Sequence, residues 1–363
     1  MSDVAPSISM ATSGPPVLVQ RLIDFQPSGR SRLGKLLGFT IASTGSYVPE
    51  QVVTNDDLAS LGCDSEWIVQ RTGIRERRKA ADDQATSDLA YEASIDCLKK
   101  AGVAPSEVDL VVVATMTPDH LTPSTACHLQ RRLGCRAPAF DVNAACAGFM
   151  YAMTTAAQFV VSGLSKKALV VGSEIMSRTI DPSDPKTYPL FGDGAGAALL
   201  VPAPTQGPQA SGLLAYTLGA EGCGGEMLCI PGGGSRLPIT ADNVDSGLQY
   251  LRMEGRSVFK WAVRVVEDSC TDVLGYCGVH PSRLAQIILH QANIRIIDAA
   301  VSDFGVDRSS VFVNLDRFGN TSAASIPLAI DEAIAQGKIQ RNDLVLLCGF
   351  GAGLSWGTGV MRW

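Results

Sequence analysis

The sequence predicts an α/β fold made of two similar halves, and three observations support this prediction. Strands and helices alternate from residue 37 onward, which is the pattern of sheets covered by helices. Several strands, such as the valine-rich run at residues 109–115, are continuously apolar, as strands buried on both faces are. Each half also contains a strand, a chemically distinctive residue and a helix in the same order. We therefore expect largely parallel sheets with helices on their faces.

The two halves show the same alternation of expected strands and helices. The expected strands of the first half are residues 38–48, 109–115, 139–143, 168–172 and 195–201, and its expected helices are residues 56–61, 65–71, 87–101 and 146–163. The expected strands of the second half are residues 286–290, 311–315 and 344–347, and its expected helices are residues 256–276, 293–304 and 321–336.

An internal duplication explains this likeness. Cys146 follows a strand and lies 17 residues before Gly163, and Asn320 follows a strand and lies 17 residues before Gly337. If the halves are repeats, Cys146 and Asn320 open equivalent helices, and a pseudo-twofold axis would bring the two helix starts to one site. A chance likeness of two βαβ units is the alternative.

Length and composition set the domain organisation. The chain has 363 residues, 46% of them hydrophobic, which suffices for a large core and about two domains. We expect halves at residues 37–205 and 206–363, preceded by a disordered tail at residues 1–36 that lacks the apolar segment of a secretory signal; a transit peptide is the alternative. The sequence contains no apolar run of about 18 residues, so no membrane span is expected.

The charge and the cysteines exclude several classes of function. A formal net charge of −6 gives no sign of a nucleic-acid binder, although a local basic patch could still bind an acidic partner. The ten cysteines form no CxxC pair and no Cys/His cluster with zinc spacing, so no metal site is expected. Reduced, mostly buried thiols indicate a reducing compartment, hence a cytoplasmic protein.

Cys146 is the candidate nucleophile. It follows a strand and begins an apolar helix, where unpaired N–H groups and the positive end of the helix dipole favour a thiolate. Its neighbours, from Ala144 to Gly148, are small and would let a substrate approach the sulfur. A buried, inert thiol is the alternative for any isolated cysteine.

His290 and Asn320 are its candidate partners. His290 ends a predicted strand, and residues at the carboxyl ends of strands line the ligand crevice of open α/β sheets. Taken alone, His290 could be a core histidine and Asn320 a helix N-cap. Together with Cys146 they indicate one catalytic site.

Two glycine-rich segments have different interpretations. Residues 348–356 follow a buried strand, so one of their N–H groups could form an oxyanion hole with the N–H of Cys146. Residues 191–197 do not connect a strand to a helix in the GxGxxG manner, which excludes a dinucleotide site and leaves close backbone packing.

With these segments identified, the chain from about residue 38 to residue 363 resembles the β-ketoacyl-ACP synthase III family of thiolase-fold condensing enzymes. The motifs that carry the resemblance are DSEWIVQRTGIRERR (residues 64–78), AACAGF (144–149), FGDGAGAA (191–198), GRSVFK (255–260), HQANIR (290–295) and LDRFGNTSAAS (315–325). The resemblance implies a thiolase-like fold, two duplicated βαβαβ-type halves stacked as αβαβα layers, and a homodimer.

The resemblance also implies a reaction. Cys146 takes an acyl group from an acyl-CoA, with the acyl oxygen held by the N–H groups of Cys146 and Ala352. Malonyl-ACP then loses CO2, His290 and Asn320 stabilise the enolate, and its carbon attacks the acyl group to give a β-ketoacyl-ACP. This step would initiate fatty-acid synthesis and needs no cofactor beyond the two thioester substrates.

Binding residues are implied less firmly, since a solvated charged face is the alternative for the basic ones. The residues matching CoA contacts are Trp67, Arg71, Arg256 and Asn293; those matching contacts to the acyl carrier protein are Lys260, Arg295 and Gln291; and those matching the acyl pocket are Thr122 and Phe350.

Two positions depart from the family pattern. Pro185, followed by Lys186, stands where the primer synthase has an arginine over the adenine, which leaves the acyl donor open. Thr122 stands where many members have phenylalanine, which predicts a roomier pocket for longer or branched primers. A specialised synthase of secondary metabolism is therefore an alternative. A non-catalytic relative is a third, which the intact Cys146, His290 and Asn320 oppose.

Overall fold

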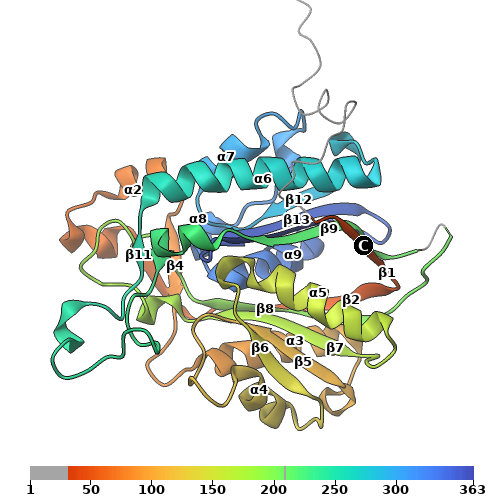
Figure 1. The fold of residues 1–363 in the computed structure, drawn as a ribbon, viewed down its shortest axis with the longest axis horizontal. Coiled ribbons are helices and arrows are strands. Elements are labelled where there is room, and N and C mark those ends of the chain that lie inside the picture. The colour runs from red at the N-terminus through yellow and green to blue at the C-terminus, as the bar shows by residue number, and fades with distance from the viewer. Residues whose placement is uncertain (1–31, 208–209) are drawn as a thin grey trace, which may run out of the picture.

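Two five-stranded sheets, with helices between them and on both outer sides, form the frame of the molecule (Figure 1). The computed structural model describes residues 32–207 and 210–363. The helices between the sheets are α5 (Gly148–Val161) and α9 (Ser325–Ala335). The predicted αβαβα layering is confirmed.

The first sheet has the strand order β2-β8-β7-β5-β6. Strands β7, β5 and β6 are parallel, whereas β8 runs antiparallel to both of its neighbours. Helices α3 (Thr86–Ala101) and α4 (Thr125–Leu133) cover its outer face (Figure 1). The bounds of the strands are β2 Phe39–Tyr47, β5 Leu110–Ala114, β6 Ala139–Val142, β7 Ala168–Glu174 and β8 Gly194–Pro202.

The second sheet has the strand order β1-β9-β14-β13-β12, with only the β12–β13 pair parallel. Helices α6 (Gly255–Cys277) and α7 (Ile294–Val301) cover its outer face (Figure 1). The bounds of the strands are β1 Gly34–Leu37, β9 Gly212–Ala220, β12 Gln286–Leu289, β13 Leu344–Gly351 and β14 Ser355–Arg362. Smaller elements are β3 Gln51–Thr54, β4 Glu76–Lys79, β10 Leu228–Cys229, β11 Arg252–Met253, α2 Ser65–Thr72 and α8 Leu315–Phe318.

The strand orders reveal the duplication. The run β2-β8-β7-β5-β6 in the first sheet matches β9-β14-β13-β12 in the second, where a single parallel bridge from Ile287 to Val311 occupies the place of β6. A 3-10 turn precedes each central helix, η3 (Ala145–Ala147) before α5 and η9 (Ser322–Ala324) before α9. The first residue of each turn has a positive φ, 45° for Ala145 and 47° for Ser322. These two residues are therefore equivalent.

This equivalence corrects the predicted register of the repeat. The side-chain oxygen of Asn143 accepts a hydrogen bond from the N–H of Ala145 at 3.2 Å, and that of Asn320 accepts one from the N–H of Ser322 at 2.9 Å. Asn320 thus corresponds to Asn143, and Cys146 corresponds to Ala323. The expected match of Cys146 with Asn320 is wrong by three positions, because spacing to a later glycine ignores the different lengths of α5 and α9.

Strand direction and one strand were also predicted wrongly. The sheets are mixed rather than largely parallel, because an apolar run does not encode direction and the short β13–β14 connection enforces an antiparallel pair. The expected strand at 311–315 is reduced to the bridge at Val311. The side chain of Gln291 takes the place of a ladder there, donating to the Phe312 carbonyl at 3.3 Å and accepting from the Asn314 N–H at 3.1 Å.

Residues 34–36, expected at the end of a disordered tail, are ordered. Residues Gly34–Leu37 form β1, which pairs antiparallel with β9 of the second sheet, and Leu36 is only 6% exposed. The rest of the predicted tail, residues 1–31, lies outside the described residues. Within the described chain, no helix is long and apolar enough to cross a membrane.

The helical layer approaches the first sheet so closely that glycine is required. A Cβ atom on Gly172 of β7 would lie 2.3 Å from the Ala323 carbonyl oxygen, and one on Gly196 of β8 would lie 2.7 Å from the Leu328 nitrogen. The backbones of η9 and α9 therefore rest directly on these strands, which fixes the height of η9 above the sheet.

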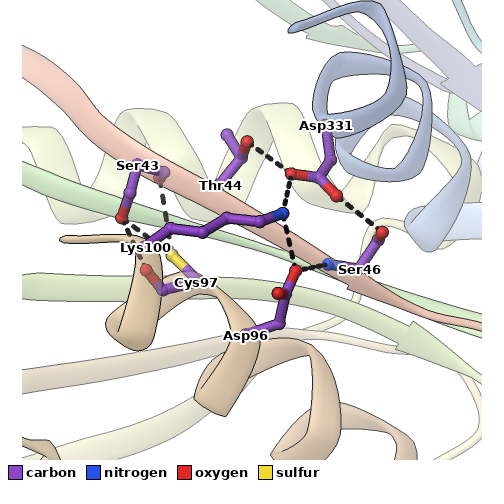
Figure 2. Close-up of polar contacts among 7 residues, drawn as sticks. All are labelled: Ser43, Thr44, Ser46, Asp96, Cys97, Lys100 and Asp331. Carbon is purple, nitrogen blue, oxygen red and sulfur yellow. Dashed lines mark hydrogen bonds and ion pairs between the residues drawn. The ribbon is translucent and has the colours of Figure 1, made fainter. Parts of the chain in front are cut away.

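A polar clamp holds the middle of α9, beyond its contact with β8 (Figure 2). The carboxylate of Asp331, 7% exposed, accepts hydrogen bonds from Thr44 at 2.8 Å and Ser46 at 2.6 Å, both on β2. It also binds the ammonium group of Lys100 on α3 at 2.8 Å, and Lys100 in turn lies 2.7 Å from Asp96. The clamp therefore joins a central helix, an edge strand and an outer helix.

The close approach can be tested with a single methyl group. We expect Gly196→Ala to lower the free energy of unfolding by about 1–3 kcal/mol, since the added Cβ must displace the α9 backbone. Gly234→Ala is the matched control, because nothing lies within 4 Å of a Cβ there. Denaturant unfolding of both variants measures the difference, and equal midpoints would show that α9 can move away at little cost.

Candidate active site

A cavity of about 330 Å³ lies where the starts of the two central helices meet. Its wall contains the three residues singled out in the sequence, Cys146, His290 and Asn320. They come from η3, from the residue after β12 and from the second residue before η9, so both halves of the fold supply the site. The wall is largely apolar elsewhere, with Met116, Phe191 and other large side chains.

The thiol of Cys146 is buried and protonated at neutral pH. The residue is 6% exposed, and burial raises the pKa of the thiol to about 12. A hydrogen bond with the Ser322 side chain acts in the opposite direction, while the nearby Glu174 carboxylate raises the pKa further. Burial thus outweighs the effect of the helix start, and the expected stabilisation of a thiolate is not seen in the resting site.

His290 is held as a neutral imidazole. Its backbone N–H donates to the Cys348 carbonyl at 2.8 Å. The Nδ1 atom of its ring lies 2.9 Å from the Ser325 hydroxyl, which donates to the Ser322 carbonyl at 2.8 Å. The ring packs edge-on against Phe350, with 5.2 Å between the ring centroids. Burial lowers the pKa of His290 to about 3. Since Nδ1 is engaged by Ser325, Nε2 is the nitrogen available to a ligand.

Asn320 is fixed by its backbone and by its side-chain oxygen. Its N–H donates to the Leu190 carbonyl at 2.8 Å, and its carbonyl accepts from the Gly192 N–H at 3.1 Å. Because its Oδ1 atom accepts the Ser322 N–H, the amide NH2 group is left to donate into the cavity. The side chain therefore caps a turn, as an N-cap would, and also presents a donor.

The end of β13 passes directly over the nucleophile. A Cβ atom on Gly351 would lie 2.7 Å from the Cβ atom of Cys146 and 3.1 Å from its sulfur. Ala352, the next residue, forms part of the cavity wall. The glycine-rich segment predicted to supply an oxyanion-hole N–H is thus in contact with Cys146.

Several predicted binding residues surround the mouth of the cavity. The guanidinium group of Arg71 lies 4.9 Å from the ring centroid of Trp67, which is 40% exposed. The side chain of Asn293 donates to the Arg71 carbonyl at 3.1 Å. The predicted residues found in the cavity wall are Trp67, Arg71, Asn293, Arg295, Phe350 and Ala352, together with Pro185 and Lys186.

Four predicted residues lie elsewhere. Arg256 and Lys260 are exposed on the first turns of α6, beside the cavity-lining Gly255 and Phe259. Gln291 is 1% exposed and bonds only to backbone groups in the described structure, so the predicted contact with a carrier protein is wrong. Thr122 is exposed on a loop outside the cavity, so within this chain it does not line the acyl pocket.

Three polar residues beneath the cavity were not predicted as part of the site. Ser325 bonds to His290. Ser322 lies beside Cys146 and bonds to Glu174, a fully buried carboxyl group at the end of β7. Glu174 could have been predicted from the sequence, because it is an acidic residue at the carboxyl end of an apolar strand, and that position lines ligand sites in α/β sheets. No group of His, Cys, Asp and Glu in the described chain could hold a metal ion.

Two family models match the chain. Residues 140–222 match 3-oxoacyl-[acyl-carrier-protein] synthase III, and residues 274–363 match the C-terminal part of the same family. The first match includes Cys146, and the second includes His290 and Asn320.

Relatives extend the match over nearly the whole chain. The β-ketoacyl-[acyl-carrier-protein] synthase III of Rhodopirellula baltica is 62% identical, covering 91% of this chain and all of the relative. The crystal structure of the synthase III from Thermus thermophilus is 44% identical with a TM-score of 0.82, covering 89% of this chain and 98% of that one. The synthase III from Aquifex aeolicus is 41% identical with the same TM-score, covering 90% and 100%.

The contact between Gly351 and Cys146 generates a test of the site geometry. We expect Gly351→Ala to reduce the rate of Cys146 modification by a thioester substrate about 100-fold, because the new methyl group must push the nucleophile aside. Gly225→Ala is the control, as its Cβ would come no closer than 3.4 Å to another atom. A Gly351→Ala enzyme that reacts at the wild-type rate would contradict this geometry.

Proposed function

The chain belongs to the β-ketoacyl-[acyl-carrier-protein] synthase III family of acyltransferases, and we propose that it joins an acyl group carried on Cys146 to malonyl-ACP. The observation that carries this proposal is the convergence of Cys146, His290 and Asn320 on one cavity. The reaction is a decarboxylative condensation that gives a β-ketoacyl-ACP and initiates fatty-acid synthesis. It requires no cofactor beyond its two thioester substrates.

In the first half-reaction, the sulfur of Cys146 attacks the carbonyl carbon of an acyl-CoA and CoA leaves. The tetrahedral oxyanion forms where the N–H groups of Cys146 and Ala352 face the cavity. Fixed backbone donors stabilise the new negative charge without having to reorganise. Such electrostatic stabilisation is usually the largest contribution to the rate enhancement. The contact between β13 and Cys146 supports this arrangement.

In the second half-reaction, malonyl-ACP loses CO2 and its thioester oxygen becomes an enolate oxygen. His290, through Nε2–H, and Asn320, through its amide, donate hydrogen bonds to that oxygen. The neutral state of His290 fits this role when the proton of the ring is on Nε2. The Ser325 hydroxyl donates to the Ser322 carbonyl at 2.8 Å in the resting structure, so we propose that it turns to donate to Nδ1 when malonyl-ACP binds. The enolate carbon then attacks the acyl group and releases the Cys146 thiolate.

The mouth of the cavity suits an acyl-CoA donor. Trp67 and Arg71 form a stacked pair that can hold an adenine ring and its phosphates. Lys186, beside Pro185, supplies a cation at the mouth. Pro185 stands in place of the family's arginine, and the neighbouring lysine does not provide the planar stacking surface of a guanidinium group, so we propose that the nucleotide is held from one face.

An acidic carrier protein would meet the basic side chains around the entrance. Arg256 and Lys260 project from the start of α6, and Arg295 lies 5.9 Å from the Phe259 ring at the cavity wall. These cations can pair with acidic groups of the carrier and with the phosphate of its prosthetic arm. Gln291 is not part of this surface.

We further propose that the enzyme is a cytoplasmic homodimer. Each subunit would consist of two halves, residues 37–205 and residues 206–363. Leu121, 91% exposed, and Thr122 lie on one loop, and β6 is an edge strand of its sheet. A second copy covering this edge would bury Leu121. Thr122 would then face the acyl pocket of the partner, and its small size favours longer or branched primers.

Intact-protein mass tests the first half-reaction. After mixing with acyl-CoAs of about two to sixteen carbons, we expect a mass gain of one acyl group that malonyl-ACP then discharges. Cys146→Ala should show no gain. Activity confined to acetyl-CoA would exclude the roomy pocket. Acylation by acyl-carrier donors alone would favour a specialised synthase instead.

Decarboxylation of malonyl-ACP in a Cys146→Ala background tests the second half-reaction. Adding Asn320→Ala should slow it about 100- to 1000-fold, since one enolate donor is lost. Asn143→Ala is the matched control, because it removes the equivalent turn hydrogen bond without a cavity donor. The rate should be flat between about pH 5 and pH 8, since His290, with a pKa of about 3, gains a proton only in stronger acid. A fall in rate near pH 6 would contradict a neutral His290.

A further inference from the structure

We propose that Ser322 and Glu174 form a proton relay that takes the thiol proton of Cys146 when the acyl-enzyme forms and returns it after condensation. This inference rests on the proposed function, because it concerns the same nucleophile. It assigns a role to two buried residues outside the Cys146, His290 and Asn320 set.

The three side chains lie next to one another beneath the cavity. The hydroxyl of Ser322 donates to the Oε1 atom of Glu174 at 3.0 Å, and it lies close enough to the Cys146 sulfur to lower the pKa of the thiol. Glu174 is fully buried and Ser322 is 1% exposed, so solvent does not separate these side chains. A hydroxyl both donates and accepts, so Ser322 can receive the thiol proton while it passes its own proton to Glu174.

Glu174 can accept a proton because neutral donors alone hold its charge. Its described hydrogen-bond partners, apart from Ser322, are the hydroxyls of Thr115 and Thr117 and the N–H groups of Met116, Thr117 and Ala323. A carboxylate without a paired cation loses no ion pair when it is protonated. Burial raises the pKa of Glu174 to about 7, close to the pH at which a general base works best.

The other described groups near Cys146 are not suited to act as the general base for its thiol. His290, with a pKa of about 3, is a poor base, and its Nδ1 atom is engaged by Ser325. The groups that face Glu174 from the packed elements are the hydroxyls of the β5 end, Gly194 of β8, Ser322 and Ala323 of η9, and Cys146 of η3. Cys146 is the titratable group among these.

The relay balances the proton through both half-reactions. As sulfur bonds to the acyl carbon, the S–H proton moves to Ser322 Oγ and the Ser322 proton moves to Glu174 Oε1. The C–S bond to CoA breaks, and the CoA thiolate leaves and takes a proton from solvent. Condensation later breaks the acyl–sulfur bond and leaves the electron pair on Cys146. The proton on Glu174 then returns through Ser322 to restore the thiol.

A single-turnover experiment on full-length protein separates this role from a structural one. The variants are Glu174→Gln and Ser322→Ala, and the control is Asp331→Asn, another buried carboxylate, located in the clamp of Figure 2. Alanine is compatible with the backbone at position 322, since Ala145 adopts the same positive φ in the other half. Circular dichroism and the thermal midpoint report whether each variant is folded.

The first readout is the rate of Cys146 acylation by an acyl-CoA accepted by the wild type. The relay predicts that Glu174→Gln and Ser322→Ala are each about 100-fold slower or more, while Asp331→Asn lowers the thermal midpoint and keeps the wild-type rate. The wild-type rate should fall as the pH drops through about 7, because Glu174 then carries a proton already. That inflection should be absent from Glu174→Gln.

The second readout is alkylation of Cys146 by iodoacetamide, which requires no thioester activity. If the charge of Glu174 only opposed thiolate formation, Glu174→Gln would react faster than wild type at neutral pH. The relay predicts the opposite sign, with slower alkylation in both relay variants. Faster or unchanged alkylation in a folded Glu174→Gln protein overturns the relay. Failure of every acyl-CoA to acylate the wild type overturns the proposed function, and the alkylation comparison still decides the relay.

Discussion

The close contact between η9 and strand β7 is the constraint on which the rest of the site depends. Gly172 leaves no room for a side chain beneath the Ala323 carbonyl, so the turn from Asn320 to Ala324 sits at a fixed height on the first sheet. That height brings Ser322 to Glu174 and Cys146, and it directs the Asn320 amide into the cavity. Backbone packing therefore positions the second half's donor against the first half's nucleophile.

The site is built to hold its reactive groups uncharged. Burial keeps Cys146 as a thiol and His290 as an imidazole, and Asn320 is neutral at any pH. Glu174, a buried acid that accepts a hydrogen bond from Ser322 beside this set, has a pKa raised toward neutrality, a pattern more typical of functional sites than of stabilising ion pairs. Charges created during the reaction would then be met by fixed dipoles, which need little rearrangement.

Much of this arrangement could be predicted from the sequence, and the failures have physical causes. Cys146, His290 and Asn320 could be found because residues at strand ends and helix starts converge at one edge of an α/β sheet. Strand direction could not, because a buried strand is apolar whichever way it runs. The buried side chain of Gln291 makes hydrogen bonds to backbone groups that a strand pair would otherwise satisfy. Nothing in the sequence distinguishes such a residue from a glutamine on the surface. The partners of Glu174 come from segments far apart in the chain, so only the folded structure brings them together.

The matching turns of Asn143 and Asn320 have a consequence for how the cavity treats its substrates. The backbone is nearly symmetric across the cavity, yet one copy of the turn is followed by Cys146 and the other by Ala323. The two turns therefore contribute different groups to the cavity: Cys146 lines it from one turn and Asn320 from the other, whereas their counterparts Ala323 and Asn143 do not line it. One chain thus places a nucleophile opposite an amide donor, as two unlike subunits could.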